Sequence, residues 1–543
     1  SRIALFVSGW IVASLHLVQA QQITGALAYH ELAFMVSDYQ YIGTARIQGL
    51  GNTQISLGGD ISSALSNPAG LGFYNRSEFS ITPSYNIFTS NTNYLGSSST
   101  SNKGKFNFDN LGIVFNKMKD DAAPGSWRGR SFAISLAKVN EFNSRIEYQG
   151  MNANNDILDF YAQDANKQNV AGEELTSNTS SAFQTYLISE FLDGVVNGRD
   201  TTLFPFYNRT FFSEYPSAEF PTNQSEIIST SGSQNQINLS YGGNFGDKIY
   251  FGFGLGIPTV RYTLRKEYSE VYPGLQGDIV GNMNLTEELN SNGVGINGTF
   301  GIIVRPVNQV TLGFSLITPS AITMSETYFS RMEAGYNNFD MGDYGDYFDA
   351  NYDLIANPDV DFTTFYSSSS NLNEEFYEQE SSFNYKITTP LRVNGGISFF
   401  LLKNGFITAD VEYVDYSNMK VNSTDDPLTS ANESINSLYG SVVNYRVGAE
   451  WRYKSFRVRG GYNHRQNPYS VSDVALSRDV FSGGLGFRST KFFMDITVSY
   501  GQWDNEYAPY VLDNPNNEAY LETPIVGLHN SNLNMVASFG LFF

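Results

Sequence analysis

The chain has 543 residues, with 33 Lys and Arg against 54 Asp and Glu, and its formal net charge is −21. A chain this anionic lacks the basic surface that binds nucleic acid, and the absence of Cys excludes a disulfide framework, a zinc site of the cysteine type and a lipoprotein anchor. Aromatic residues make up 15% of the chain and charged residues 16%, with 49 Gly and a mean hydropathy of −0.26; this is typical of a membrane β-barrel rather than a helical membrane protein.

The first residues predict a secretory signal peptide. An apolar stretch from Ile3 to Val18 follows Arg2. It is followed by Gln19 and the small residue Ala20. This arrangement is that of a signal peptide with a cleavage site. We assign residues 1–20 to it and expect the mature protein to begin at Gln21.

The stretch Gly43–Gly72 is rich in Gly, Ser, Ala and Asn and carries few bulky apolar residues. It can form neither a membrane strand nor an ordinary core helix, and it precedes a long series of strands. Asp60 can cap a short helical turn, and the sequence Asn67-Pro68-Ala69-Gly70 then ends it, because the residue before Pro disfavours helix. Residues 21–76 are therefore predicted to form a plug inside a barrel, with a flexible linker as the alternative.

Fourteen segments after Ser77 have the length of a tilted membrane strand, about 10 residues. In the segment 491–502, Phe492, Met494, Ile496, Val498 and Tyr500 alternate with polar residues, which is the period of a strand with one apolar face. The segments are 79–88, 108–116, 131–140, 235–243, 249–262, 292–305, 309–319, 385–400, 405–417, 442–453, 455–465, 479–489, 491–502 and 532–543.

Short and long connections alternate between these segments, as they do in barrels with short periplasmic turns and long extracellular loops. The largest predicted loops are 141–234 and 320–384. The fold prediction is all-β: a fourteen-stranded antiparallel transmembrane β-barrel over 77–543, with the N-terminal plug (hatch) in its lumen. A soluble β-sandwich is the alternative, but it would not readily give this regular pairing.

Several motifs, in chain order, resemble those of the FadL/TodX-like family of long-chain fatty acid and hydrophobic-compound transporters. The motifs are Gly58-Gly59-Asp60 with Asn67-Pro68-Ala69-Gly70-Leu71, the hairpin 298–315, Thr389-Pro390-Leu391-Arg392, and the pair Gly448-Ala449-Glu450-Trp451 and Arg459-Gly460-Gly461-Tyr462. The lead-in at residue 43 most resembles members from Bacteroidetes. The resemblance implies a bacterial outer-membrane location, a hatch that includes Asn67, Pro68, Ala69 and Gly70, and no cofactor. The long loops depart from the family pattern.

The same alternation places a set of charged residues on the inner face of three strands near the C-terminus. Charged side chains facing lipid near the midplane would cost about 2–4 kcal/mol for Arg. Either the set braces wall against plug with ion pairs, or it forms a polar gate. Its members are Asp410, Glu412, Arg446, Glu450, Arg452, Arg457 and Arg459.

Two loop features carry further hypotheses. Asp340, Asp343, Asp346 and Asp349 suggest calcium but lack the ligand spacing of an EF-hand, so a solvated loop without metal is favoured. Ser181 to Val196 has helical spacing, and its apolar face could pack on a loop, accept a hydrophobic substrate or dock a partner. Its candidate contact residues are Phe183, Tyr186, Leu187 and Phe191.

No catalytic motif is present, and His30, His464 and His529 lie far apart in sequence. We therefore predict a protein that is not an enzyme. The resemblance implies passive uptake of hydrophobic small molecules such as fatty acids or aromatic compounds, with lateral release into the outer-membrane lipid. The alternative is a barrel that does not transport and that binds other outer-membrane proteins through its long loops, as a subunit of a secretion or assembly complex.

Overall fold

A computed structural model describes residues 27–40, 42–119, 126–192, 209–213, 221–272, 280–340, 371–401, 404–424, 427–470, 476–514 and 521–543. The predicted signal peptide 1–20 lies outside these residues. So do the acidic residues Asp343, Asp346 and Asp349.

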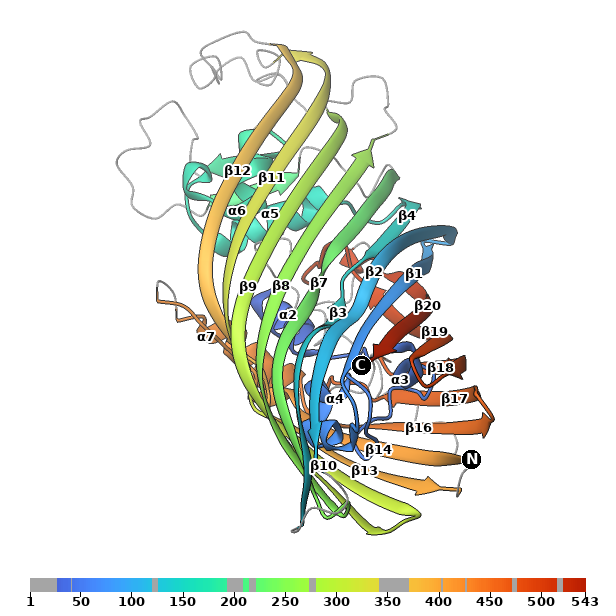
Figure 1. Cartoon of the computed structure of the whole chain (residues 1–543). Helices are drawn as coiled ribbons and strands as arrows, with labels where there is room; N and C mark the ends of the chain where they lie inside the picture. Colours follow the sequence, from blue (N-terminus) through green and yellow to red (C-terminus); the bar gives the residue numbers. More distant parts are fainter. Residues whose placement is uncertain are drawn as a thin grey trace, which may run out of the picture.

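The strands form one closed antiparallel sheet, in which β20 pairs back onto β1 (Figure 1). The sheet has 18 segments, and four pairs of them continue one another (β3 with β4, β10 with β11, β12 with β13, β14 with β15), so the wall has fourteen strands. This confirms the predicted barrel. The segments are β1 Glu78–Tyr94, β2 Ser97–Met118, β3 Trp127–Glu141, β4 Ser144–Asn152, β7 Thr222–Phe245, β8 Ile249–Val271, β9 Val280–Val307, β10 Val310–Ile317, β11 Ala321–Asp340, β12 Asn371–Thr388, β13 Arg392–Phe400, β14 Gly405–Asp415, β15 Lys420–Asn422, β16 Ser441–Tyr453, β17 Phe456–Arg465, β18 Arg478–Arg488, β19 Phe492–Tyr507 and β20 Val526–Phe542.

The outer face carries a belt of apolar side chains. On β19, Met494, Ile496 and Val498 are 41%, 58% and 47% exposed, whereas Asp495 and Thr497 on the inner face are buried. The period-2 pattern of the sequence thus has its apolar side outward, as a wall that faces lipid requires.

Two neighbouring strands of the wall are each interrupted near a proline. Pro319 separates β10 from β11, and Pro390 separates β12 from β13, because proline has no N–H to donate to the ladder. Thr389 N donates to Ser320 O at 3.0 Å, which ties the two breaks together. The sequence prediction of one continuous strand over 385–400 is wrong at this point.

Above the belt, one side of the barrel continues as a tall sheet, which we call the raised sheet (Figure 1). It consists of β4, the upper parts of β7, β8 and β9, and β11 and β12, paired in that order. The predicted loops 141–234 and 320–384 are therefore shorter than expected, because β4, β7, β11 and β12 occupy much of them.

Helices fill the space inside the wall. The helices are α2 Tyr29–Ser37, α3 Ala45–Gln48, α4 Ser63–Ser66, α5 Ile157–Gln168, α6 Ser177–Gln184 and α7 Thr429–Leu438, with the 3-10 helices η2 Pro68–Phe73, η3 Gly172–Glu174 and η7 Tyr416–Asn418; a separate hairpin pairs β5 Ile188–Leu192 with β6 Arg209–Ser213. Leu32, Ala33 and Val36 of α2 join an apolar cluster with β8, β9, β11 and α7. None of the described helices is long and apolar enough to cross a membrane.

Candidate functional site

Residues 42–76, which we call the N-terminal segment, contact inward-facing groups of strands around the barrel. Ala45 N donates to Ser538 Oγ on β20 at 2.7 Å, and Thr497 Oγ1 on β19 donates to Ala45 O at 2.6 Å. On other strands, Ser240 Oγ on β7 donates to Ala64 O at 2.8 Å. Thr311 Oγ1 on β10 donates to Ser56 O at 2.8 Å, and because β10 and β20 lie on opposite sides of the ring, the segment spans the lumen.

Glycines of the wall receive the backbone of this segment. A Cβ added at Gly461 would lie 2.0 Å from Gly51 N, and one at Gly313 would lie 2.1 Å from Ile55 O. No side chain fits into these gaps without displacing backbone. The small residues of the segment and the glycines of the wall therefore allow a close approach of two main chains.

The hatch motif turns the chain within this segment. Asn67 Oδ1 accepts from Ala69 N at 3.2 Å, Asn67 Nδ2 donates to Ile55 O at 2.7 Å, and Pro68 begins η2. Asn67, Ala69 and Gly70 are buried. Asn67 thus connects η2 to the loop at Ile55, and the motif stabilises the fold of the N-terminal segment at this turn.

A first charged cluster is centred on Glu450 of β16. Its carboxylate accepts from Arg459 Nε and Arg452 Nε, each at 2.7 Å, and Arg459 Nη1 lies 2.6 Å from Asp495 Oδ1. Arg46 of the N-terminal segment approaches the same carboxylate at 3.8 Å. All but Arg452 are buried, so the cluster joins the wall to the segment inside the lumen.

A second charged cluster surrounds Glu412 of β14. Arg392 Nη1 and Arg446 Nη2 lie 3.3 Å and 3.4 Å from Glu412 Oε1, and all three residues are buried. Glu412 and Arg446 were candidates from the sequence. Arg392 was not among the candidates, although it belongs to one of the recognised motifs.

Asp410 and Arg457 complete the set of candidates. Asp410 Oδ2 accepts from the backbone N–H of Gln54 at 2.7 Å and of Ile55 at 3.0 Å, so it holds the N-terminal segment directly. Arg457 instead donates to the carbonyl oxygens of Lys454 and Phe456 in its own turn and joins neither cluster. Arg46 and Asp495 were missed by the sequence analysis; Asp495 could have been found, since the alternation of β19 points it inward.

Residues 37–40, which we call the crossing segment, connect four different strands. Arg392 Nη2 donates to Ser37 O, Asp38 pairs with Arg465 of β17, and Tyr39 OH donates to Gln236 Oε1 on β7 at 2.8 Å. Gln40 N donates to Val139 O on β3 at 2.7 Å. The crossing segment therefore holds opposite sides of the wall together.

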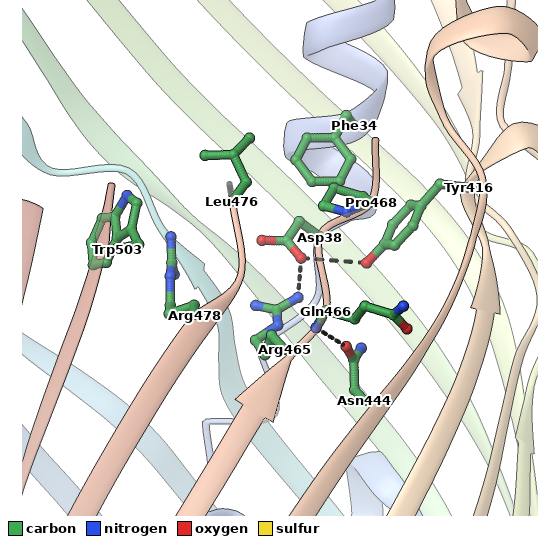
Figure 2. A pocket seen from close by; sticks show the side chains of 10 residues that line it. All are labelled: Phe34, Asp38, Tyr416, Asn444, Arg465, Gln466, Pro468, Leu476, Arg478 and Trp503. Atoms are coloured by element: carbon green, nitrogen blue, oxygen red, sulfur yellow. Dashed lines mark hydrogen bonds and ion pairs between the residues drawn. The ribbon is translucent and has the colours of Figure 1, made fainter. Parts of the chain in front are cut away.

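A small cavity of about 80 Å³ adjoins the crossing segment (Figure 2). Asp38 lies between Arg465 and Tyr416, while Trp503 lies against Arg478, whose guanidinium carbon is 3.9 Å from the ring centroid. Aromatic rings and guanidinium groups thus line it together.

The wall is broken beside the crossing segment, between β2 and the strand formed by β3 and β4. The backbone ladder joins residues 110–118 of β2 to residues 129–137 of β3, and among the described residues no pairing joins β2 to β4. Side chains bridge the gap instead: Lys138 Nζ lies 2.8 Å from Asp109 Oδ1, and Lys105 Nζ donates to Asn143 Oδ1 at 3.2 Å. We call this gap the wall break.

The crossing segment and the N-terminal segment both bond to the wall break. Asn140 Nδ2, where the β3 register shifts, donates to Asp38 O at 3.1 Å, and Gln40 Nε2 donates to Asn140 Oδ1 at the same distance. Gln48 Nε2 donates to Asp109 Oδ2 at 2.8 Å. A shift of these segments would therefore change the contacts that bridge the gap.

Solved structures match nearly the whole chain, among them the following two. A FadL homologue of Pseudomonas aeruginosa matches with a TM-score of 0.51 and 12% identity, over 92% of this chain and 98% of its own. The toluene transporter TodX of P. putida matches with a TM-score of 0.51 and 12% identity, over 93% of this chain and 99% of its own. The chain has the FadL-type barrel fold. No protein-family model and no curated protein sequence matches it.

In this FadL-type barrel, residues 153–187 form an insert that packs against the inner face of the raised sheet. Leu158, Tyr161 and Ala165 of α5 join an apolar cluster with Met283 and Met332 of the sheet. In Figure 1 the helices α5 and α6 lie behind β11 and β12.

The candidate apolar residues of the insert do not share one helical face. The helix α6 ends at Gln184, because Tyr186 adopts a φ of +61° that a helix cannot continue. Phe183 and Leu187 pack into the insert, and Tyr186 is 40% exposed. Phe191 lies on β5, and its side chain is outside the described part of the chain. The expected helix over 181–196 is wrong.

Glu270, on the part of β8 beyond the apolar belt, anchors the insert. Its carboxylate accepts from Tyr272 OH at 2.7 Å, from Gln224 Nε2 at 2.7 Å and from Ile157 N at 3.1 Å. Burial raises the pKa of Glu270 to about 7, and burial together with nearby Glu270 raises the pKa of Asp156, which caps α5.

The stability of the insert is expected to fall as the pH rises. The folded-state pKa of Glu270 lies above its ordinary value of 4.5, so its contribution is fully present below that value and is lost as the pH passes through about 7. Limited proteolysis within 153–187 should be faster at about pH 8 than at about pH 5, and Glu270→Gln should weaken this dependence. Glu267→Gln, on the exposed face of the same strand, is the control. If proteolysis of Glu270→Gln depended on pH as strongly as that of the native protein, Glu270 would not be the group responsible.

Proposed function

We propose that the chain is an outer-membrane channel that takes up hydrophobic small molecules and releases them sideways into the membrane through the wall break. The solved structures with the same fold include a toluene transporter, and this supports the class of substrate. The predicted signal peptide and the outward apolar belt support the location.

The observation that carries the proposal is the position of the wall break within the apolar belt. Phe106 and Phe108 on β2 are 59% and 54% exposed on the outer face, and they lie in the part of β2 that pairs with β1 but has no ladder on its β3–β4 side. A molecule leaving here would meet lipid directly. It would avoid periplasmic water, where exposed apolar surface costs about 25 cal/mol per Å².

Within the described part of the chain, the lumen offers no comparable apolar exit past the N-terminal segment. That level holds Glu450, Arg459, Asp410 and Glu412, all buried and hydrogen-bonded. Moving an apolar molecule through it would require breaking these contacts, and an unpaired buried charge is costly. We propose that residues 21–76 act as the hatch and that a shift of the crossing segment loosens the side chains that bridge the wall break.

Closing the wall break should abolish uptake. Because the chain has no Cys, Lys105→Cys with Asn143→Cys can be joined by a short, reducible bifunctional thiol reagent without side reactions. Uptake of a radiolabelled long-chain fatty acid and of toluene into cells should fall to background after cross-linking and return after reduction.

The matched control joins strands that are already paired. Thr89→Cys with Asn102→Cys, facing each other on β1 and β2, should accept the same reagent without loss of uptake. Full uptake through the cross-linked wall break would rule out this exit. Failure of the unmodified protein to take up either probe would rule out the channel itself.

A further inference from the structure

The raised sheet has two lateral edges, and side chains of neighbouring strands close only one of them. At the β4 edge, backbone carbonyls accept bonds from the β1–β2 hairpin. Thr92 Oγ1 donates to Glu147 O at 2.8 Å, and Ser101 Oγ donates to Arg145 O at 2.6 Å. This edge has little capacity left for a further strand.

The other edge, formed by β12, has few backbone partners among the residues that the structure describes. One side of β12 pairs with β11 along nearly its whole length, whereas the other side pairs only at residues 386–388, with β15. Further up, Ser423 Oγ donates to Asn384 O at 2.9 Å, and over 375–383 the described residues provide no backbone partner on that side. In Figure 1, β12 forms the outer margin of the tall side.

The sequence of this edge does not prevent strand addition. Natural edge strands avoid unwanted pairing by Pro, by charged side chains, especially Lys, by a bulge or by shortness. The charged residues within 375–385 are all Glu, which oppose an acidic strand but attract a basic one. Residues 375–385 contain neither Pro nor Lys, they carry four aromatic residues, and their register with β11 is regular. An edge of this kind is a template for an added strand.

The charges of this edge identify the kind of strand that would fit. Glu378 and Glu380 point outward. Arg331 pairs with Glu378 at 2.7 Å and with Glu333 at 2.6 Å, whereas the described residues form no ion pair with Glu380. Antiparallel pairing of two copies about Gln379 would place Glu378 of each copy opposite Glu380 of the other, and like charges at facing positions destabilise a sheet. A net charge of −21 also keeps two copies apart.

We infer that the free edge of β12 accepts an extended, basic segment of another protein, added as a further antiparallel strand. Lys or Arg at alternate positions of the added segment would lie beside Glu380. Its backbone would pair with residues 375–383. This surface does not take part in the proposed uptake through the wall break. It is a specific binding site for the protein partner that the sequence analysis expected at the long loops.

The test uses the full-length protein in detergent and a labelled peptide of alternating Lys and Thr. Fluorescence anisotropy should show saturable binding, and Glu380→Lys should weaken it by about tenfold at low salt, because one attraction becomes a repulsion. Glu267→Lys, on the outer face of β8 away from the edge, should leave binding unchanged.

Two further peptides separate strand pairing from simple attraction of charge. The same peptide with alternate backbone nitrogens methylated keeps its charge but cannot form the ladder, so it should lose binding. A peptide with Glu in place of Lys should not bind. Equal binding of the methylated peptide, equal binding to the Glu380→Lys protein, or no saturable binding at all would each overturn the inference.

Discussion

Replacing Gly461 by valine is expected to make the barrel leaky to large hydrophilic solutes. A Cβ at this position would lie 2.0 Å from Gly51 N, so the side chain must displace the backbone of the N-terminal segment. Overpacking of this kind costs up to about 3 kcal/mol, and this cost favours states in which the part of the segment around Gly51 has moved away from the wall. Cells that produce the variant should become sensitive to large hydrophilic antibiotics that native cells exclude.

The neighbouring glycine provides a matched control. A Cβ at Gly460 would meet nothing within 4 Å, and this residue lies on the outer face of the same strand. Gly460→Val should therefore leave permeability unchanged. An equal leak from both variants would show that valine disturbs β17 itself rather than the contact between β17 and the N-terminal segment. An intact barrier in Gly461→Val would show that this contact does not keep the lumen closed.

Replacing Arg459 by alanine is expected to cause the largest loss of stability among single substitutions in the charged clusters. Arg459 bonds to both Glu450 and Asp495, and all three are buried. Its removal leaves Asp495 without a cation in direct contact among the described residues, and breaking a buried pair in this way costs about 3–5 kcal/mol. Urea titration of the detergent-solubilised barrel should show the change as a lower midpoint.

Arg452 tests whether burial decides the effect. It bonds to the same carboxylate at the same distance of 2.7 Å, but its side chain is 31% exposed. Arg452→Ala should cost no more than about 1 kcal/mol, as exposed ion pairs generally do. Equal losses for Arg459→Ala and Arg452→Ala would mean that the cluster does not act as a buried network.

The barrel strands could be predicted because lipid requires an apolar outer face. In β19 and β20 the apolar period is regular, and the structure follows it residue by residue. The raised sheet was missed because its pattern is inverted. On β8, Tyr262 and Leu264 point inward while Thr263 and Arg265 point outward into water, so no apolar outer face marks the strand.

The candidate site could be predicted only in part. Alternation along β14, β16 and β17 placed Glu412, Arg446 and Glu450 on the inner face, where the structure has them. Arg46 and Asp38 could not be found in this way, because Arg46 lies on the one-turn helix α3 and Asp38 directly follows α2, outside any strand. Their partners are set by how these parts of the chain cross the lumen, and no local period encodes this.

The closure of β20 onto β1 also constrains the order of assembly. Ala45, near the start of the described chain, exchanges hydrogen bonds with residues of β19 and β20 that lie 452 and 493 positions further along the chain and are made much later. Main-chain contacts such as that of Gly51 with Gly461 can form only when the strand that carries Gly461 is in place. The segment therefore reaches its full set of contacts only after β19 and β20 have joined the wall, so closure of the ring and seating of the segment are coupled steps.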